Sequence, residues 1–204
     1  EISECLVGSE MCIRDRDLTV VIDVGHGGND PGKIGVDNVK EKDVNLQIAL
    51  CLKAQLQARG VKVILTREGD VCLATNGATN KKVSDMHNRV SLINASGADY
   101  MISIHQNSYP EAEISGPQVF YYGSSEMSKK LAEAIQAQLI VDLQPPKERE
   151  IKTGNDLYIL KNSQCPGVIV ECGFLSNPTE CENLQNPQYQ QAVATAIARA
   201  ICKL

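Results

Sequence analysis

The feature that most restricts the fold is an alternation, from Leu18 onward, of short runs rich in β-branched residues with longer stretches of helical periodicity. Such alternation is typical of α/β domains, in which the strands form a largely parallel sheet and the helices cover its faces. We therefore predict an α/β fold with one domain: a three-layer sandwich with a mostly parallel sheet of about six strands and helices on both faces. The predicted strands are Thr19–Val24, Val61–Thr66, Tyr100–His105, Gln118–Tyr122, Leu157–Leu160 and Gly167–Glu171.

Apolar residues that recur every three or four positions indicate four amphipathic helices. The first is predicted over Glu41–Arg59 and ends at Gly60. The other three are marked by the sets Val83, Met86, Val90, Ile93; Met127, Leu131, Ile135, Leu139; and Tyr189, Val193, Ile197, Ile201. Residues Gln144–Asn155 contain a Pro–Pro pair and five charged residues, which predicts an exposed loop.

Composition supports one globular domain and excludes several classes of protein. The chain has 204 residues, of which 43% are hydrophobic, enough for a sizeable core. Its net charge of -5 argues against a nucleic-acid partner, which normally requires a basic face. No run approaches the roughly 18 apolar residues of a membrane-spanning helix. The eight cysteines show no C-x-x-C spacing, so we expect mostly free thiols rather than a cysteine metal cluster.

Residues 1–16 show neither helical nor strand periodicity, nor the pattern of a signal peptide. We expect them to be a non-native or disordered tail, and residues 17–204 to form the one folded domain. A native export signal is not visible in the chain, which says nothing about where the protein works.

Two of the three histidines follow predicted strands. His26 lies in the glycine-rich segment Asp23–Gly32, and His105 closes the apolar run Met101–His105. The carboxyl ends of parallel strands are where α/β sheets place ligand sites, so both histidines are expected at one edge. The glycines allow close approach of the backbone to a ligand, whereas the G-K-[ST] or G-x-G-x-x-G of a nucleotide site is missing.

Two glutamates complete the candidate site. Glu41 opens the first long helix, where an acidic residue is also favoured by the helix dipole alone. Beside His26 and His105 it would form the two-histidine, one-carboxylate set of a catalytic zinc site. Glu171 ends the strand Gly167–Glu171, where burial of a carboxylate is costly unless it has a partner, and it is our candidate for the catalytic general base.

Three further polar residues lie near or within the predicted strands and helices. Arg67, after the second strand, is a candidate to orient a substrate carboxylate or Glu171, and Asn107, just past His105, to bind a peptide carbonyl. Both residue types also serve as ordinary surface and turn residues. His87, within a predicted helix, is expected to have a surface or packing role.

With these residues in view, the chain resembles the zinc-dependent N-acetylmuramoyl-L-alanine amidases of the type 3 family, from about Val20 to the C-terminus. The resemblance is carried by Ile22–Gly28, Lys40–Leu46, Leu65–Arg67, Ser103–Ser108 and Val170–Asn177. It implies that His26, Glu41 and His105 bind Zn²⁺ and that Glu171 is catalytic. The chain departs from the family at Val24, where proline is usual, and we expect altered loop stiffness there rather than lost activity.

The same resemblance implies a biological setting. The substrate is expected to be peptidoglycan, cut between the lactyl group of muramic acid and the L-alanine of the stem peptide. Details around Asp85–Arg89, His105–Ser108 and Glu171–Gly173 are most similar to the sporulation and germination subgroup, which acts on the way to the muramic lactam of the spore cortex. An extracytoplasmic location in the cell or spore envelope follows from the resemblance. Gly123–Ser125 leaves no room for an inhibitory inserted helix, so any regulation is expected from elsewhere: an activating protein partner, expression or export.

Two alternatives remain at this point. A zinc peptidase could cut within the stem peptide using the same residues, and a non-catalytic wall-binding protein could use the same fold. The second is disfavoured because all four site positions are intact.

Overall fold

The computed structural model describes residues 18–204, and the expectation for residues 1–16 lies outside this range. Six strands form one sheet in the order β2-β1-β3-β6-β4-β5. They are β1 (Thr19–Val24), β2 (Lys62–Leu65), β3 (Tyr100–Asn107), β4 (Gln118–Tyr121), β5 (Lys152–Thr153) and β6 (Gly167–Phe174). Strands β2, β1, β3 and β6 are mutually parallel, and β4 runs antiparallel to β6. The mostly parallel sheet is therefore confirmed.

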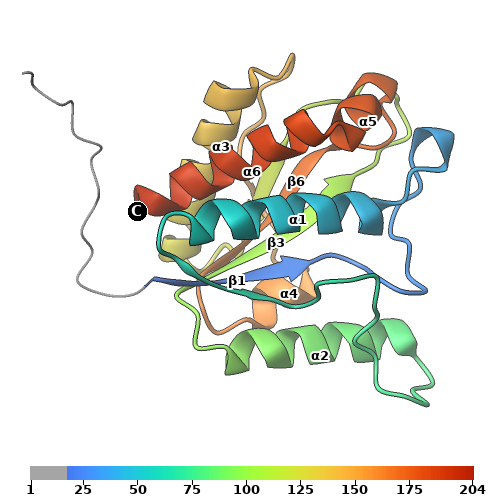
Figure 1. The fold of residues 1–204 in the computed structure, drawn as a ribbon, viewed down its shortest axis with the longest axis vertical. Coiled ribbons are helices and arrows are strands. Elements are labelled where there is room, and N and C mark those ends of the chain that lie inside the picture. The colour runs from blue at the N-terminus through green and yellow to red at the C-terminus, as the bar shows by residue number, and fades with distance from the viewer. Residues whose placement is uncertain (1–17) are drawn as a thin grey trace, which may run out of the picture.

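Helices cover both faces of the sheet, which confirms the three-layer prediction (Figure 1). One face carries α1 (Glu41–Gln57), α3 (Glu126–Leu143) and α6 (Pro187–Cys202), with α5 (Pro178–Gln185) packed against α6 and β6. The other carries α2 (Lys81–Ala95) and α4 (Tyr158–Asn162), which contact each other. A short 3₁₀ helix, η1 (Val36–Asn38), precedes α1.

The two apolar layers follow from the alternation of side chains along the strands. In β1, Val20, Ile22 and Val24 belong to the larger core under α1, α3 and α6, whereas Val21 faces the smaller core under α2 and α4. The central strands are buried along most of their length on both faces, as expected for parallel strands covered by helices. This rigid centre fixes the strand ends that carry the site.

One predicted strand is wrong. Leu157–Leu160 does not pair in the sheet; Tyr158–Asn162 forms α4, which buries Ile159 and Leu160. A run of four apolar residues is too short to separate a period of 2 from a period of 3.6. The sixth strand is instead Lys152–Thr153, inside the segment 144–155 that we predicted as an exposed loop. It is a two-residue edge strand with exposed side chains, so no apolar pattern marks it.

Two other expectations concern cysteines and membranes. The six cysteines between residues 18 and 204 are all free thiols, as expected, while Cys5 and Cys12 lie outside the described range. In that same range, every helix is too short or too polar to cross a lipid bilayer.

Candidate active site

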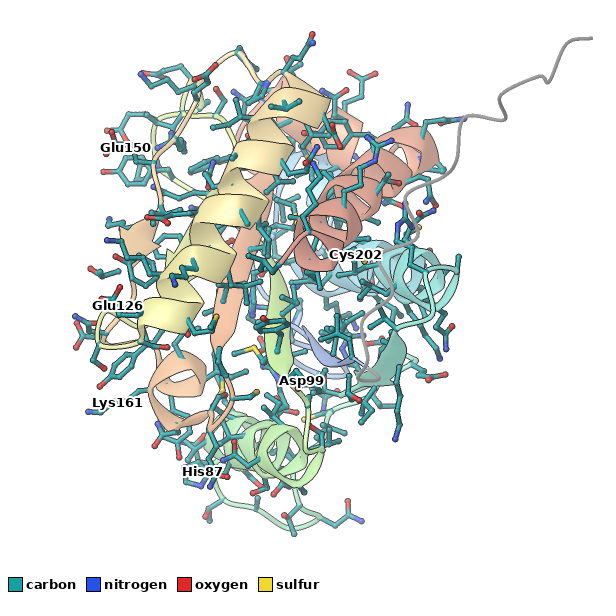
Figure 2. All side chains as sticks on the ribbon, turned by 90° about the vertical axis from the view of Figure 1, so that its left-hand side faces the viewer. His87, Asp99, Glu126, Glu150, Lys161 and Cys202 are labelled. Atoms are coloured by element: carbon teal, nitrogen blue, oxygen red, sulfur yellow. The ribbon has the colours of Figure 1, made fainter. Side chains whose placement is uncertain are left out.

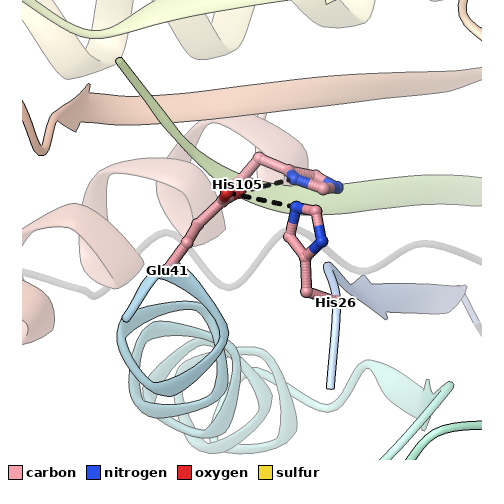
Figure 3. A group of neighbouring side chains, drawn as sticks. All are labelled: His26, Glu41 and His105. Atoms are coloured by element: carbon pink, nitrogen blue, oxygen red, sulfur yellow. Dashed lines mark hydrogen bonds and ion pairs between the residues drawn. The ribbon is translucent and has the colours of Figure 1, made fainter. Parts of the chain in front are cut away.

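His26, Glu41 and His105 meet at the carboxyl edge of the sheet (Figure 3). His26 follows β1, His105 lies in β3, and Glu41 is the first residue of α1. Strands β1 and β3 are adjacent and parallel, so their ends lie side by side. The loop after His26 returns the chain to the same edge, where the Lys42 amide donates to the Pro31 carbonyl and the Glu41 amide to the Lys33 carbonyl.

The side chains of these three residues converge closely. His26 Nε2 lies 3.1 Å from Glu41 Oε2, and His105 Nδ1 lies 2.8 Å from Glu41 Oε1. The imidazole rings are 5.0 Å apart at their centroids and nearly perpendicular. One ligand atom from each residue falls within 4.8 Å of the other two. Two imidazoles and one carboxylate around a single point are the donor set of a catalytic zinc site with one open position, so these residues fit that ion.

Glycines allow this convergence. A Cβ atom at position 25 would lie 2.4 Å from Cε1 of His105, and one at position 32 would lie 2.5 Å from Oε2 of Glu41. Gly32 also has a φ of 70°, which disfavours other residues. The close backbone approach expected of the glycine-rich segment is therefore an approach to the site's own side chains.

Glu41 is held as a carboxylate. Its Oε2 accepts from the Lys33 amide at 2.8 Å, and its Oε1 accepts from the Gln106 amide at 3.2 Å and from Asn45 Nδ2 at 3.4 Å. Burial alone would raise the pKa of Glu41, but the hydrogen bonds and charges of His105 and His26 lower it far below the usual range. The same carboxylate, together with Asp30, raises the pKa of His26 against the opposing effect of burial.

Glu171 lies beside this cluster in β6, in register with His105 of β3. Its Oε2 is buried and has no hydrogen-bond partner in the described part of the chain. Burial raises the pKa of Glu171 to about 7. A carboxyl group with a free oxygen and a pKa near neutrality can both accept and return a proton at physiological pH.

The structure gives Arg67 a different role from the one we expected. The residue is only 4% exposed, and its guanidinium donates to four backbone carbonyls, those of Val24, Gly25, Lys42 and Gly69. These bonds tie the loops around the site together and leave the guanidinium committed to the backbone rather than to a substrate carboxylate or Glu171.

Asn107 and His87 lie where their predicted roles would place them. Asn107 ends β3, with its Oδ1 accepting from the Ser108 amide at 2.8 Å, and its contact with substrate stays a prediction. His87 belongs to α2, on the side of the molecule where α4 and Lys161 lie (Figure 2), and stacks on Tyr158 at 5.2 Å. It takes no part in the site.

Two features of the site were missed from the sequence. Asp30 accepts from His26 Nδ1 at 2.7 Å, a contact that its i+4 spacing and its position in the same glycine-rich segment could have suggested. Asp23, buried beneath the site, is paired with Arg89 of α2 and also accepts from Ser103 Oγ at 2.5 Å. Asp23 and Arg89 are 66 positions apart in the sequence, so their pairing becomes visible only in the tertiary structure.

Comparison with known proteins is consistent with this geometry. The chain matches the N-acetylmuramoyl-L-alanine amidase family over residues 20–203. The germination-specific N-acetylmuramoyl-L-alanine amidase of Bacillus subtilis (strain 168) is 41% identical over 187 residues, which cover 90% of this chain and 78% of that protein. The sporulation-specific amidase of the same organism is 30% identical over 194 residues, covering 90% and 67%.

Solved structures agree with the sequence matches. The CwlD amidase of Clostridioides difficile, in complex with the GerS lipoprotein, has a TM-score of 0.88 and 38% identity, covering 92% of this chain and 98% of that one. The amidase AmiC2 of Nostoc punctiforme has a TM-score of 0.80 and 33% identity, covering 91% and 96%.

Proposed function

Because this chain belongs to the N-acetylmuramoyl-L-alanine amidase family and is therefore a peptidoglycan hydrolase, we propose that it works with zinc held by His26, Glu41 and His105 and with Glu171 as its proton-transferring residue. The observation that carries the proposal is the convergence of these three side chains beside a buried glutamate oxygen that has no partner among the described residues. In a buried site such an orphaned oxygen is costly unless a ligand or water satisfies it.

The proposed reaction replaces a C–N bond by a C–O bond. Zinc, when bound, supplies Lewis-acid polarisation of the amide carbonyl and lowers the pKa of water. Glu171 accepts a proton from the attacking water as its oxygen bonds to the lactyl carbonyl carbon. The protonated Glu171 then donates this proton to the departing nitrogen of L-alanine, leaving a free amine and a lactyl carboxylic acid, which releases its remaining proton to solvent at neutral pH. His26, Glu41 and His105 hold the ion, and the raised pKa of Glu171 suits both proton transfers.

Two variants separate the ligand role from the catalytic role. We expect Glu41→Gln to lose zinc during dialysis, because the amide is a poor ligand. We expect Glu171→Gln to keep one zinc per chain and to lose turnover by about 10²–10⁴-fold, the usual contribution of a general base. Glu68→Gln, an exposed glutamate paired with Lys53, is the matched control and should change neither zinc content nor rate. Loss of zinc from Glu171→Gln would make Glu171 a ligand and contradict the assignment.

The proposed setting is the spore or cell envelope, outside the cytoplasm, with a protein partner. Support comes from the similarity to germination-specific and sporulation-specific amidases, and to an amidase solved as a complex with a lipoprotein. The test is complementation of a Bacillus subtilis strain that lacks its germination-specific amidase. Muropeptide analysis should show cortex muramic lactam restored by the exported chain and not by its Glu171→Gln variant. Equal failure of both, despite activity in vitro, would contradict the spore role.

A further inference from the structure

We propose that Asp30 is a positioning residue for the zinc ligand His26. Its carboxylate bonds to Nδ1 of the His26 imidazole and so directs Nε2 toward the metal. This role depends on the proposed zinc site, and Asp30 is not itself a ligand in it. Asp30 Oδ2 lies 2.7 Å from His26 Nδ1, on the side of the ring opposite the cluster. The other ring nitrogen, Nε2, is the one 3.1 Å from Glu41 Oε2.

The backbone builds this contact into one tight turn. The amides of Gly27 and Asp30 each donate to the other's carbonyl, at 3.0 and 3.1 Å, and so close the turn that follows His26. The second oxygen of Asp30 accepts from the Gly32 amide at 3.3 Å. His26 itself has a φ of 61°, an uncommon conformation for a residue other than glycine, and the closed turn maintains it. Backbone hydrogen bonds thus hold Asp30 beside His26.

The two histidines are supported differently. His105 presents Nδ1 to Glu41, and its ring lies against the backbone of Gly25, with no carboxylate bonded to its Nε2 in the described residues. His26 alone has a carboxylate on its outer nitrogen. A hydrogen bond from the outer N–H to a carboxylate fixes the tautomer and makes the inner nitrogen a better ligand, and its loss typically costs about 10–100-fold in metal affinity. The orientation of the His26 ring should therefore depend on Asp30, whereas the orientation of the His105 ring depends on its position in β3.

Competitive titration with a chromophoric chelator measures the effect as zinc affinity, without reference to turnover. We expect Asp30→Ala to weaken zinc binding by about 10–100-fold. Asp30→Asn should lose several-fold, because an amide oxygen can still accept from Nδ1 but carries no charge. Asn29→Ala is the matched control: this exposed neighbour lies in the same turn, and we expect wild-type affinity. Substitution of cobalt for zinc gives a visible absorption spectrum, which should change in Asp30→Ala and not in Asn29→Ala.

The thermal midpoint of each metal-free variant separates positioning from folding. Wild-type zinc affinity and an unchanged cobalt spectrum in Asp30→Ala would overturn the inference. If Asp30→Ala does not fold, unchanged affinity in Asp30→Asn overturns it. A wild-type chain that binds no zinc would instead refute the proposed metal site itself, so the two failures can be told apart.

Discussion

Replacement of Arg89 by methionine removes the cation from a charge pair buried beneath the site. Asp23 is fully buried and Arg89 is 4% exposed. Arg89 Nε donates to Asp23 Oδ1 at 2.7 Å, and Nη2 donates to Oδ2. Ser103 Oγ and Thr66 Oγ1 also donate to this carboxylate, at 2.5 and 3.2 Å. The variant would leave Asp23 with two hydroxyl donors and no counter-charge.

Removal of one partner from a buried ion pair usually costs about 3–5 kcal/mol of unfolding free energy. Because Ser103 and Thr66 still donate to Asp23, we expect the lower end, about 3 kcal/mol. For a chain of this size, that corresponds to a fall in the thermal midpoint of about 6–12 °C. Arg59→Met, which removes an exposed arginine just after α1, is the control and should change stability by less than about 0.5 kcal/mol.

The destabilisation should depend on pH. In the wild type, burial favours a raised pKa for Asp23, but Arg89 and the hydroxyl donors hold the pKa below its usual value. That contribution to stability is present at neutral pH and is lost as the pH falls. In Arg89→Met, burial prevails and the folded-state pKa rises above the unfolded value, so stability is lost as the pH rises. Urea unfolding of metal-free protein should therefore show a larger deficit at pH 7.5 than at pH 5. A deficit below about 1 kcal/mol, or one independent of pH, would refute this reasoning.

Three other predictions follow from named contacts. The specificity constant kcat/KM should fall as the pH drops through the pKa of Glu171, because the protonated carboxyl group cannot act as a base. Burial raises this pKa to about 7, and bound zinc would lower it. A kcat/KM that stays constant from pH 7.5 to 4.5 would contradict the role of Glu171 as base. Arg67→Met should cost about 2–3 kcal/mol in urea unfolding, since it leaves buried carbonyls without a charged donor; a change confined to the KM for substrate would instead favour a substrate contact. Gly32→Ala should reduce zinc content after dialysis, because the added Cβ would crowd Glu41 and His26. Full zinc occupancy would contradict this expectation and would mean that the backbone around residue 32 shifts to make room.

Three of the four site residues, His26, His105 and Glu171, lie in or just after apolar strands, and this pattern predicted the location of the site. A parallel sheet brings His26 and His105 to one edge whatever the strand order, but their closeness also requires β1 and β3 to be neighbours, which the sequence did not indicate. For Glu41 the helix dipole also explains an acidic first turn, whereas the family resemblance favours a role as metal ligand. The three-layer sandwich followed from the same alternation of strands and helices.

Other features could not be predicted, since local patterns do not encode them. The antiparallel direction of β4 depends on how the 108–117 connection returns to the sheet. Arg67 follows a strand just as His26 does, yet its guanidinium turns inward to loop carbonyls that no pattern reveals. The short β5 and α4 lack enough residues to display a period, so tertiary packing determined both.

Zinc-dependent cleavage of the bond between muramic acid and L-alanine can be examined in a single digestion. Purified peptidoglycan is incubated with the protein, with and without a chelator and then with zinc restored, and the products are identified by mass spectrometry. We predict peptides with a free N-terminal alanine and glycan strands with unsubstituted muramic acid, both lost on chelation and recovered with zinc. Shortened peptides still attached to the glycan would contradict the proposed substrate bond, and cleavage unaffected by the chelator would contradict the proposed zinc dependence.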